Sequence, residues 1–196
     1  LRFHPAIKKI KYYLKKKYIG KVYHVYSEWG EYLPNWHPNQ NYKKSYASRK
    51  NGGGTSLTLS HDVDLLRWFF GPIKKIAIEK IFKSSLKIKA ESASDYLIKF
   101  NSGMNAQIHL DYLQKDPSRY LKILGENGKI IFKYYEKKMT LEKSNTKKKI
   151  FKFNKFDRND MFIEEIKHFF KCIKKRRKTF LSVEESFKLL VETKLI

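Results

Sequence analysis

Between residues 73 and 154, short runs rich in Ile, Leu, Tyr and Phe alternate with turn-forming residues, and this alternation constrains the fold more than any other feature. Such runs predict β-strands. The turns Asn101–Gly103 and Gly125–Gly128 are too short for a crossover, so the strands that they join must pair antiparallel. We therefore expect a large, mostly antiparallel sheet with strands at Ile73–Phe82, Ser94–Phe100, Met104–Leu113, Tyr120–Leu124, Lys129–Tyr134, Met139–Glu142 and Ile150–Phe153, and one more over residues 21–33.

Helical patterns flank this strand series on both sides. Strands in series with helices at either end predict an α+β fold in which the helices pack on one face of the sheet. We expect residues 1–196 to form a single domain. The predicted helices run from Pro5 to near Gly20, over Gly54–Phe70, and over two later segments, one capped by Asp160 and the other by a capping box of Ser182 and Glu185.

The chain carries a formal net charge of +24, which would suit the binding of phosphates. Its lysines are spread along the whole sequence, however, and arginine, the residue best suited to phosphates and bases, is scarce. A charge run on an amphipathic helix is typical of a solvated face, so we favour that interpretation over nucleic-acid binding. No apolar run is long enough for a membrane span, and a single cysteine, Cys172, fits a reducing cytoplasm.

The segment Gly52–Gly71 holds the strongest candidate for chemistry. His61 points away from an apolar stripe, with Thr58 and Asp64 three residues to either side. Imidazole titrates near neutral pH and is costly to bury without a partner. His61 is therefore either a proton-transfer group or a histidine hydrogen-bonded within the core. The stripe, at helical spacing, consists of Leu59, Val63, Leu66 and Phe70.

Several segments match a known family in order: Arg2–Pro5 with Ile19–Val22, Tyr32–Pro38, Gly52–Gly71, Leu110–Gln114 with Pro117–Arg119, Gly125–Gly128, and Arg158–Phe162. In these the chain resembles the C-terminal, substrate-side domain of the glucose-fructose oxidoreductase / inositol dehydrogenase / MocA (Gfo/Idh/MocA) family of NAD(P)-dependent sugar oxidoreductases. The resemblance covers essentially the whole sequence. No Gly-x-Gly-x-x-Gly fingerprint follows any predicted strand. The family's N-terminal Rossmann domain, with its catalytic lysine, is therefore expected to be absent, and the chain to be truncated on that side.

The resemblance implies a role for the residues around His61. His61 matches the family's active-site histidine, which exchanges a proton with the sugar hydroxyl. Thr58 stands where many relatives have an aspartate, and a hydroxyl cannot stabilise imidazolium by charge. Asp64 is the candidate to supply that charge; the alternatives for Asp64 are a pair with a lysine and a local cap. On the cofactor side, the resemblance implies Arg2, Gly53 and Gly54. We expect no metal site.

Further candidates could bind the substrate. Aromatic faces stack on sugar rings, and guanidinium binds carboxylate or phosphate, although ordinary loop packing and a solvated turn residue are the alternative interpretations. One of Asp111 and Tyr112 must face the open side of the sheet, because neighbouring residues of a strand alternate. The candidates are Trp36, His37, Tyr42, Tyr46 and Arg49 in the long loop over residues 34–54, and Arg119 after Pro117.

The resemblance implies the substrate-binding half of an oxidoreductase that acts on a secondary hydroxyl of a sugar, sugar nucleotide or cyclitol. NAD or NADP would serve the full-length parent, and we expect neither tight cofactor binding nor activity from this chain alone. The expected partners are the Rossmann domain, the substrate, and further copies of the chain through the exposed sheet face, in the cytoplasm and without a membrane. The alternatives are a non-catalytic carbohydrate-binding module and a basic nucleic-acid-binding module.

Overall fold

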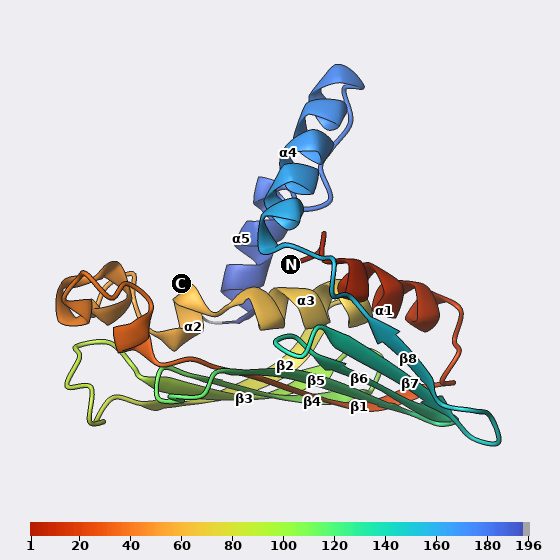
Figure 1. The fold of residues 1–196 in the computed structure, drawn as a ribbon, viewed down its shortest axis with the longest axis horizontal. Coiled ribbons are helices and arrows are strands. Elements are labelled where there is room, and N and C mark those ends of the chain that lie inside the picture. The colour runs from red at the N-terminus through yellow and green to blue at the C-terminus, as the bar shows by residue number, and fades with distance from the viewer. Residues whose placement is uncertain (194–196) are drawn as a thin grey trace.

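The computed structural model describes residues 1–193 and shows one curved sheet with helices packed on a single face, which confirms the predicted α+β architecture (Figure 1). The sheet has eight strands in the order β2-β3-β4-β1-β5-β6-β7-β8. The strands are β1 (Val22–Gly30), β2 (Ile73–Ile81), β3 (Ala93–Phe100), β4 (Asn105–Asp111), β5 (Ser118–Gly125), β6 (Gly128–Lys133), β7 (Lys138–Lys143) and β8 (Lys149–Lys152).

The first strand of the chain lies in the middle of the sheet, between β4 and β5. Its pairing with β4 is parallel. All other neighbouring strands of the sheet, including β1 and β5, pair antiparallel. The C-terminal ends of β1 and β4 therefore meet the start of β5 at one edge. There Trp29 lies opposite Arg119 across β1 and β5, and Gly30 lies opposite Asp111 across β1 and β4.

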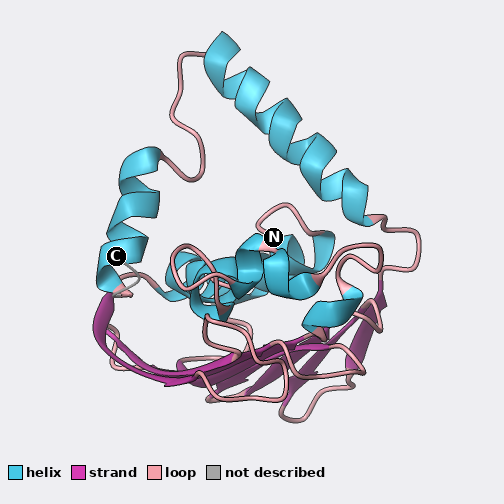
Figure 2. Cartoon of the chain, turned by 90° about the vertical axis from the view of Figure 1, so that its left-hand side faces the viewer, coloured by secondary structure: helices cyan, strands magenta, loops and turns pink. Residues whose placement is uncertain are grey.

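The core lies between the sheet and two helices, α1 (Pro5–Lys15) and α3 (His61–Phe70) (Figure 2). Alternate strand residues point into it because successive side chains of a strand face opposite sides. His4 caps α1 with its Nδ1, which accepts a hydrogen bond of 3.0 Å from the amide of Ala6. Residues buried in this layer include Ile7, Ile10, Val25, Leu66, Ile98, Phe100, Ile108, Leu110 and Ile123.

The prediction of one helix over Gly54–Phe70 is wrong in one respect: the structure has two helices there. A short α2 (Thr55–Thr58) ends at Leu59, whose φ of −108° and ψ of 15° leave the helical region, and α3 begins at His61. The hydroxyls of Thr58 and Ser60 donate to backbone carbonyls within this segment, at 2.7 and 2.9 Å, and such bonds compete with the helical ladder. The break places His61 at the start of a helix rather than in its interior.

The segment before α2 is also more ordered than the predicted loop. It contains three single 3-10 turns, η1 (Leu33–Asn35), η2 (Tyr42–Lys44) and η3 (Tyr46–Ser48).

Of the last two helices, α4 (Arg158–Lys174) projects away from the sheet and α5 (Val183–Glu192) returns toward it (Figure 1). The cap of α4 is Asp157 rather than the predicted Asp160: its Oδ1 accepts from the amide of Asn159 at 2.7 Å. Asp160 completes a capping box by accepting from the amide of Asp157 at 3.0 Å. Ser182 caps α5 as predicted, accepting from the amide of Glu185. Within residues 1–193, no helix has the length and apolar character that crossing a bilayer requires.

Candidate functional site

His61 stands at the first position of α3 with its ring stacked against Trp29 of β1. The two ring centroids are 5.8 Å apart and the rings are inclined by 28°. The imidazole is accessible to solvent and forms no hydrogen bond with any residue that the structure describes. Burial lowers the pKa of His61 below its usual value, and the positive charge of Arg119 lowers it further. The ring is therefore neutral at pH 7, with a nitrogen able to accept a proton.

Arg119 and Asp62 form a mostly buried ion pair beneath this ring. Their side chains are 9% and 4% exposed, and the guanidinium carbon of Arg119 lies 3.6 Å from the centroid of the Trp29 ring. The hydroxyl of Ser27 donates to the other oxygen of Asp62 at 2.9 Å. Arg119 therefore lies on strand β5 beside Trp29, and its guanidinium is paired with the Asp62 carboxylate.

Arg2 and Asp64 form the second ion pair beside His61. The Nε and Nη2 of Arg2 donate to the two oxygens of Asp64 at 3.0 and 2.6 Å, a bidentate arrangement, and Nη1 donates to the carbonyl of Phe180. Two residues that the sequence assigned to different roles, cofactor binding and charge supply to His61, are therefore paired with each other.

Thr58 joins a different group of side chains. Its hydroxyl donates to the carbonyl of Gly54 at 2.7 Å and hydrogen-bonds the hydroxyl of Tyr112. Burial raises the pKa of Tyr112, so its hydroxyl stays protonated. Trp36 packs edge-on against the Tyr112 ring, with centroids 5.3 Å apart. Thr58 thus links α2 to Tyr112, just after β4, and forms no hydrogen bond with the imidazole among the described residues.

The glycines before α2 are required by close backbone approach. A Cβ on Gly53 would lie 2.5 Å from the carbonyl oxygens of Tyr46 and Arg49. Gly54 has a φ of +86°, and a Cβ there would lie 2.3 Å from the carboxyl carbon of Glu91. That buried carboxylate accepts from the amide of Ser56 at 3.1 Å. The anion at the start of α2 is therefore a side chain of the chain itself.

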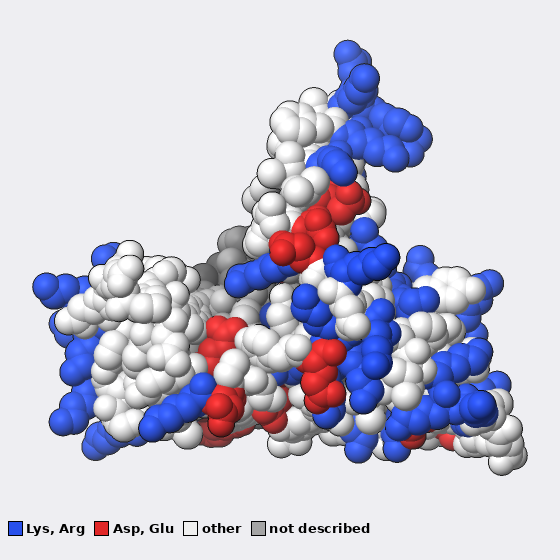
Figure 3. All heavy atoms as spheres, viewed as in Figure 1, with Lys and Arg blue, Asp and Glu red and all other residues white. Residues whose placement is uncertain are grey.

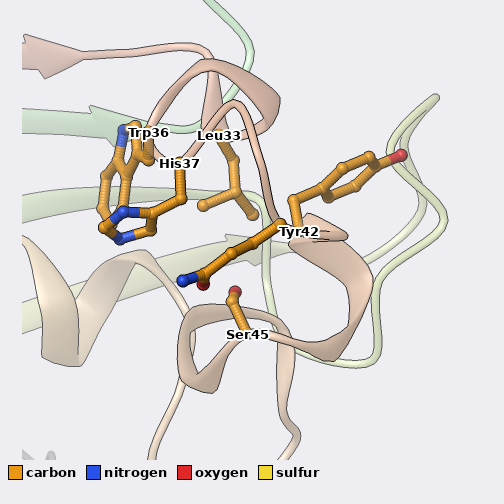
Figure 4. Close-up of a pocket in the computed structure, with 6 residues that line it drawn as sticks. Leu33, Trp36, His37, Tyr42 and Ser45 are labelled. Atoms are coloured by element: carbon orange, nitrogen blue, oxygen red, sulfur yellow. The ribbon is translucent and has the colours of Figure 1, made fainter.

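Trp36, His37 and Tyr42 gather around a small cavity in the loop that follows β1 (Figure 4). The cavity measures about 10 Å³, which is room for a single water molecule and not for a sugar. The Tyr42 ring points away from Trp36 and His37, and its hydroxyl donates to the carbonyl of Leu86 at 3.2 Å. Tyr46 and Arg49 are exposed farther along this loop.

Four residues of the site were not predicted from the sequence: Trp29, Glu31, Asp62 and Tyr135. The indole Nε1 of Trp29 donates to Glu31 Oε1 at 3.0 Å, and the hydroxyl of Tyr135 donates to the same oxygen. Burial and this bond to Glu31 raise the pKa of Tyr135. The sequence held one signal for Trp29: in a strand that alternates, it shares the core-facing side of β1 with Val25 and Ser27.

The open face of the sheet carries a separate polar cluster around His109. Its two ring nitrogens lie 2.7 Å from an oxygen of Asp95 and 3.0 Å from an oxygen of Asp111. These hydrogen bonds, first that of Asp111 and then that of Asp95, raise the pKa of His109 to about 9, so the ring is charged at neutral pH. Asp111 thus faces the open side, while Tyr112 faces the helices.

Positive charge covers the molecule broadly. Figure 3 shows lysine and arginine over both ends of the sheet and at the far end of α4, interrupted by acidic and neutral side chains. Within the described part of the chain, no group of three or more His, Cys, Asp and Glu side chains could hold a metal ion.

The comparisons with known proteins agree with this architecture. Residues 7–131 match a family model described as the GFO/IDH/MocA C-terminal domain. No curated protein sequence matches the chain. Among solved structures, it is similar to levoglucosan dehydrogenase in complex with NADH (16% identity, TM-score 0.83), to an oxidoreductase from Agrobacterium radiobacter in complex with NAD+, L-tartaric acid and magnesium (16%, 0.82), and to UDP-N-acetylglucosamine 3-dehydrogenase from Acidithiobacillus ferrooxidans (15%, 0.74).

These structures cover 97%, 98% and 97% of the chain, whereas the chain spans only 60%, 58% and 56% of their own lengths. At such identities the likeness shows a shared fold. Because the family match spans more than half of the sequence, the chain belongs to the GFO/IDH/MocA family.

Proposed function

We propose that this chain, residues 1–196, is the substrate-binding domain of an NAD(P)-dependent oxidoreductase that acts on a secondary hydroxyl of a sugar, sugar nucleotide or cyclitol. Family membership supports this proposal, as do the dehydrogenases among the similar structures. His61 is the acid/base group, and the substrate lies against His61 and the edge of the sheet formed by the ends of β1 and β4.

The observation that carries the proposal is the state of His61. A base that removes the proton of a hydroxyl must be accessible, neutral and free of competing hydrogen bonds. The His61 imidazole meets these conditions, because it is exposed, lacks a hydrogen-bond partner among the described residues and has a lowered pKa. Trp29 fixes the plane of the ring, and the Arg119–Asp62 pair fixes Trp29. During oxidation a ring nitrogen takes the hydroxyl proton, and during reduction it returns one.

The residues of this chain do not by themselves fit a dinucleotide. Arg2 is paired with Asp64, and the Glu91 carboxylate fills the space beside Gly54 at the start of α2. A phosphate placed there would meet a like charge. We therefore propose that NAD or NADP is held by a separate Rossmann half, corresponding to the part of the similar structures that this chain does not span. The chain alone would then lack activity.

The surface that this half would cover is the apolar side of α4. Phe170 and Ile166 there are 63% and 56% exposed, and Phe162, Phe169 and Ile173 are also exposed. Apolar patches of this extent usually mark an interaction surface. The solved relatives are longer than this chain by the equivalent of another domain, so the dinucleotide-binding half is the occupant that we propose.

A homo-oligomer formed through the open face of the sheet is a further part of the proposal. Leu97 and Leu124 are exposed on that face, beside the polar cluster around His109. Sedimentation of the complete enzyme should give a single oligomeric species, and Leu97→Lys should shift it toward the monomer. We place the enzyme in the cytoplasm, because its one cysteine, Cys172, suits a reducing compartment.

Hydride transfer in the enzyme assembled with its dinucleotide-binding half tests the role of His61. His61→Asn should lower kcat by about 10²- to 10⁴-fold, the usual contribution of a general acid/base. His24→Asn, which changes a histidine near the start of β1, at the other end of the strand from Trp29, is the matched control and should retain most of the activity. Full activity in His61→Asn would refute the assigned role.

A further inference from the structure

The charged side chains that act on His61 are already paired with each other. Arg119 is held by Asp62 and Arg2 by Asp64, and all four side chains are at least four-fifths buried. Removing one member of a buried pair leaves an uncompensated charge and is strongly unfavourable. Neither arginine is therefore free to bind a carboxylate or phosphate of a substrate.

Glu31 is the exception among the charged side chains of this site. It follows β1 directly, and it forms no ion pair with any residue that the structure describes. Trp29 and Tyr135 donate to its Oε1 from two directions and so fix the carboxylate in place. Its Oε2 accepts no hydrogen bond from the described residues, although an ionised carboxylate can accept about four in all.

Glu31 is also connected to the proposed acid/base group through one aromatic ring. The Trp29 side chain that donates to Glu31 is the one against which His61 stacks. The Glu31 carboxylate and the His61 ring therefore both contact the same indole, and a substrate hydroxyl at His61 would lie beside that indole.

We propose that Glu31 is a specificity-determining residue that accepts hydrogen bonds from hydroxyls of the substrate and excludes acidic groups from that end of it. The inference rests on the proposed function of His61 and names its substrate class: a polyhydroxylated ring without a carboxylate or phosphate beside the reacting carbon. Hydroxyls donate to a carboxylate in strong, charge-assisted bonds. An acidic substituent would instead face the negative charge of Glu31, and both arginines are occupied.

The indole N–H signals of the chain provide a test that needs no cofactor. Trp29 reports on Glu31, while Trp68 serves as an internal reference in the same nuclear magnetic resonance spectrum. D-glucose and D-glucuronate, which differ only in the acidic group, are titrated in parallel. Glucose should shift the Trp29 indole and His61 signals, and glucuronate should bind about tenfold or more weakly, the scale expected for hydrogen bonds to a charged group.

Variants separate the carboxylate from its surroundings. Glu31→Gln should weaken glucose binding about tenfold and remove most of the preference over glucuronate. Tyr135→Phe keeps the carboxylate and should keep the preference. Glu136→Gln makes the same charge change at the adjacent exposed position and should have no effect. Circular dichroism checks that each variant is folded.

The inference would be overturned if glucuronate bound as tightly as glucose, or if Glu31→Gln kept the preference for glucose. It would also be overturned if neither sugar shifted the Trp29 indole signal at the highest sugar concentration of the titration. Tighter binding of glucuronate with a shift of His61 would leave the role of His61 standing. Loss of the proposed function would show instead as hydride transfer that does not depend on His61, whichever sugar binds.

Discussion

Helices α3 and α4 carry the same kind of apolar stripe but lie in opposite surroundings. On α3 the side chains of Val63 and Leu66 are completely buried against the sheet. On α4 the equivalent pattern, Ile166 and Phe170 among others, is more than half exposed. Helical periodicity therefore indicates that a face will be covered, but it does not say by which surface.

The candidate proton-transfer site lies beside the buried helix α3 and not beside the exposed stripe of α4. The residues around His61 lie in the packed layer, where the two oxygens of Asp62 are bonded by Ser27 and Arg119. Precise placement of a proton-transfer group requires such support. The α4 stripe has no comparable support within the described residues, which suits a surface that awaits a partner and not a reaction site.

Matched truncations on the two helices should show the largest difference. Leu66→Ala should lower the free energy of unfolding by about 2–5 kcal/mol, because it leaves a cavity in the core. Ile166→Ala, a change of similar size at a site 56% exposed, should change it by less than about 0.5 kcal/mol. Denaturant unfolding at low protein concentration measures both. Equal costs would mean that α4 is packed in solution.

Acid should destabilise the packed layer through His4. Burial first, and then the charge of Arg119, lower the pKa of His4 to about 4, and its Nδ1 must stay unprotonated to accept from Ala6. The folded state has the lower pKa, so the stability is complete above about pH 6.5 and falls as the pH drops from there toward 4. The loss attributable to His4 should reach about 3 kcal/mol.

His4→Asn isolates this contribution, because asparagine also caps a helix but does not titrate. Unfolding free energies of the variant, measured from pH 7 to pH 4, should fall less steeply than those of the parent chain. Identical slopes would show that His4 does not link folding to protons.

The fold was predictable largely because its signals are local. Short apolar runs separated by tight turns predicted the antiparallel sheet correctly. The burial of the apolar stripe that contains Leu66 and the cap formed by Ser182 were also predicted correctly. The break at Leu59 was missed because it depends on hydroxyls of Thr58 and Ser60, which helix patterns tolerate. The central place of β1 was also not predictable, because the partner strand β4 is more than seventy residues away.

The sequence predicted some residues of the candidate site, among them His61, Asp64 and Arg119, but not their pairings. Sequence spacing placed Thr58 and Asp64 near His61, yet Thr58 bonds Tyr112 and Asp64 bonds Arg2. Both partners come from distant segments, and one sequence contains no local trace of such contacts. For the same reason Glu91 beside Gly54 could not be foreseen.

Arg67 connects the packed helix α3 to α5, and its loss should have a smaller effect. Its Nε and Nη2 donate to the two oxygens of Glu192, and Nη1 donates to Glu185, so α3 holds α5. Arg67→Gln should cost about 1 kcal/mol, because the acidic partners are partly solvated. Arg49→Gln, at an exposed arginine, is the control. The cost should shrink at high salt, and a salt-independent loss would contradict an electrostatic link.

The cap of α4 should give the smallest and most local effect. Asp157→Ala removes the side chain that accepts from Asn159, a change worth about 1 kcal/mol of helix stability. Because the α4 stripe is not buried, this helix should open without unfolding the sheet. Amide hydrogen exchange should therefore rise about fivefold in α4, as that energy implies, and stay unchanged in α3. An equal rise in both helices would show that α4 opens only when the whole molecule unfolds, and the contrast between the two helices would then be one of exposure alone.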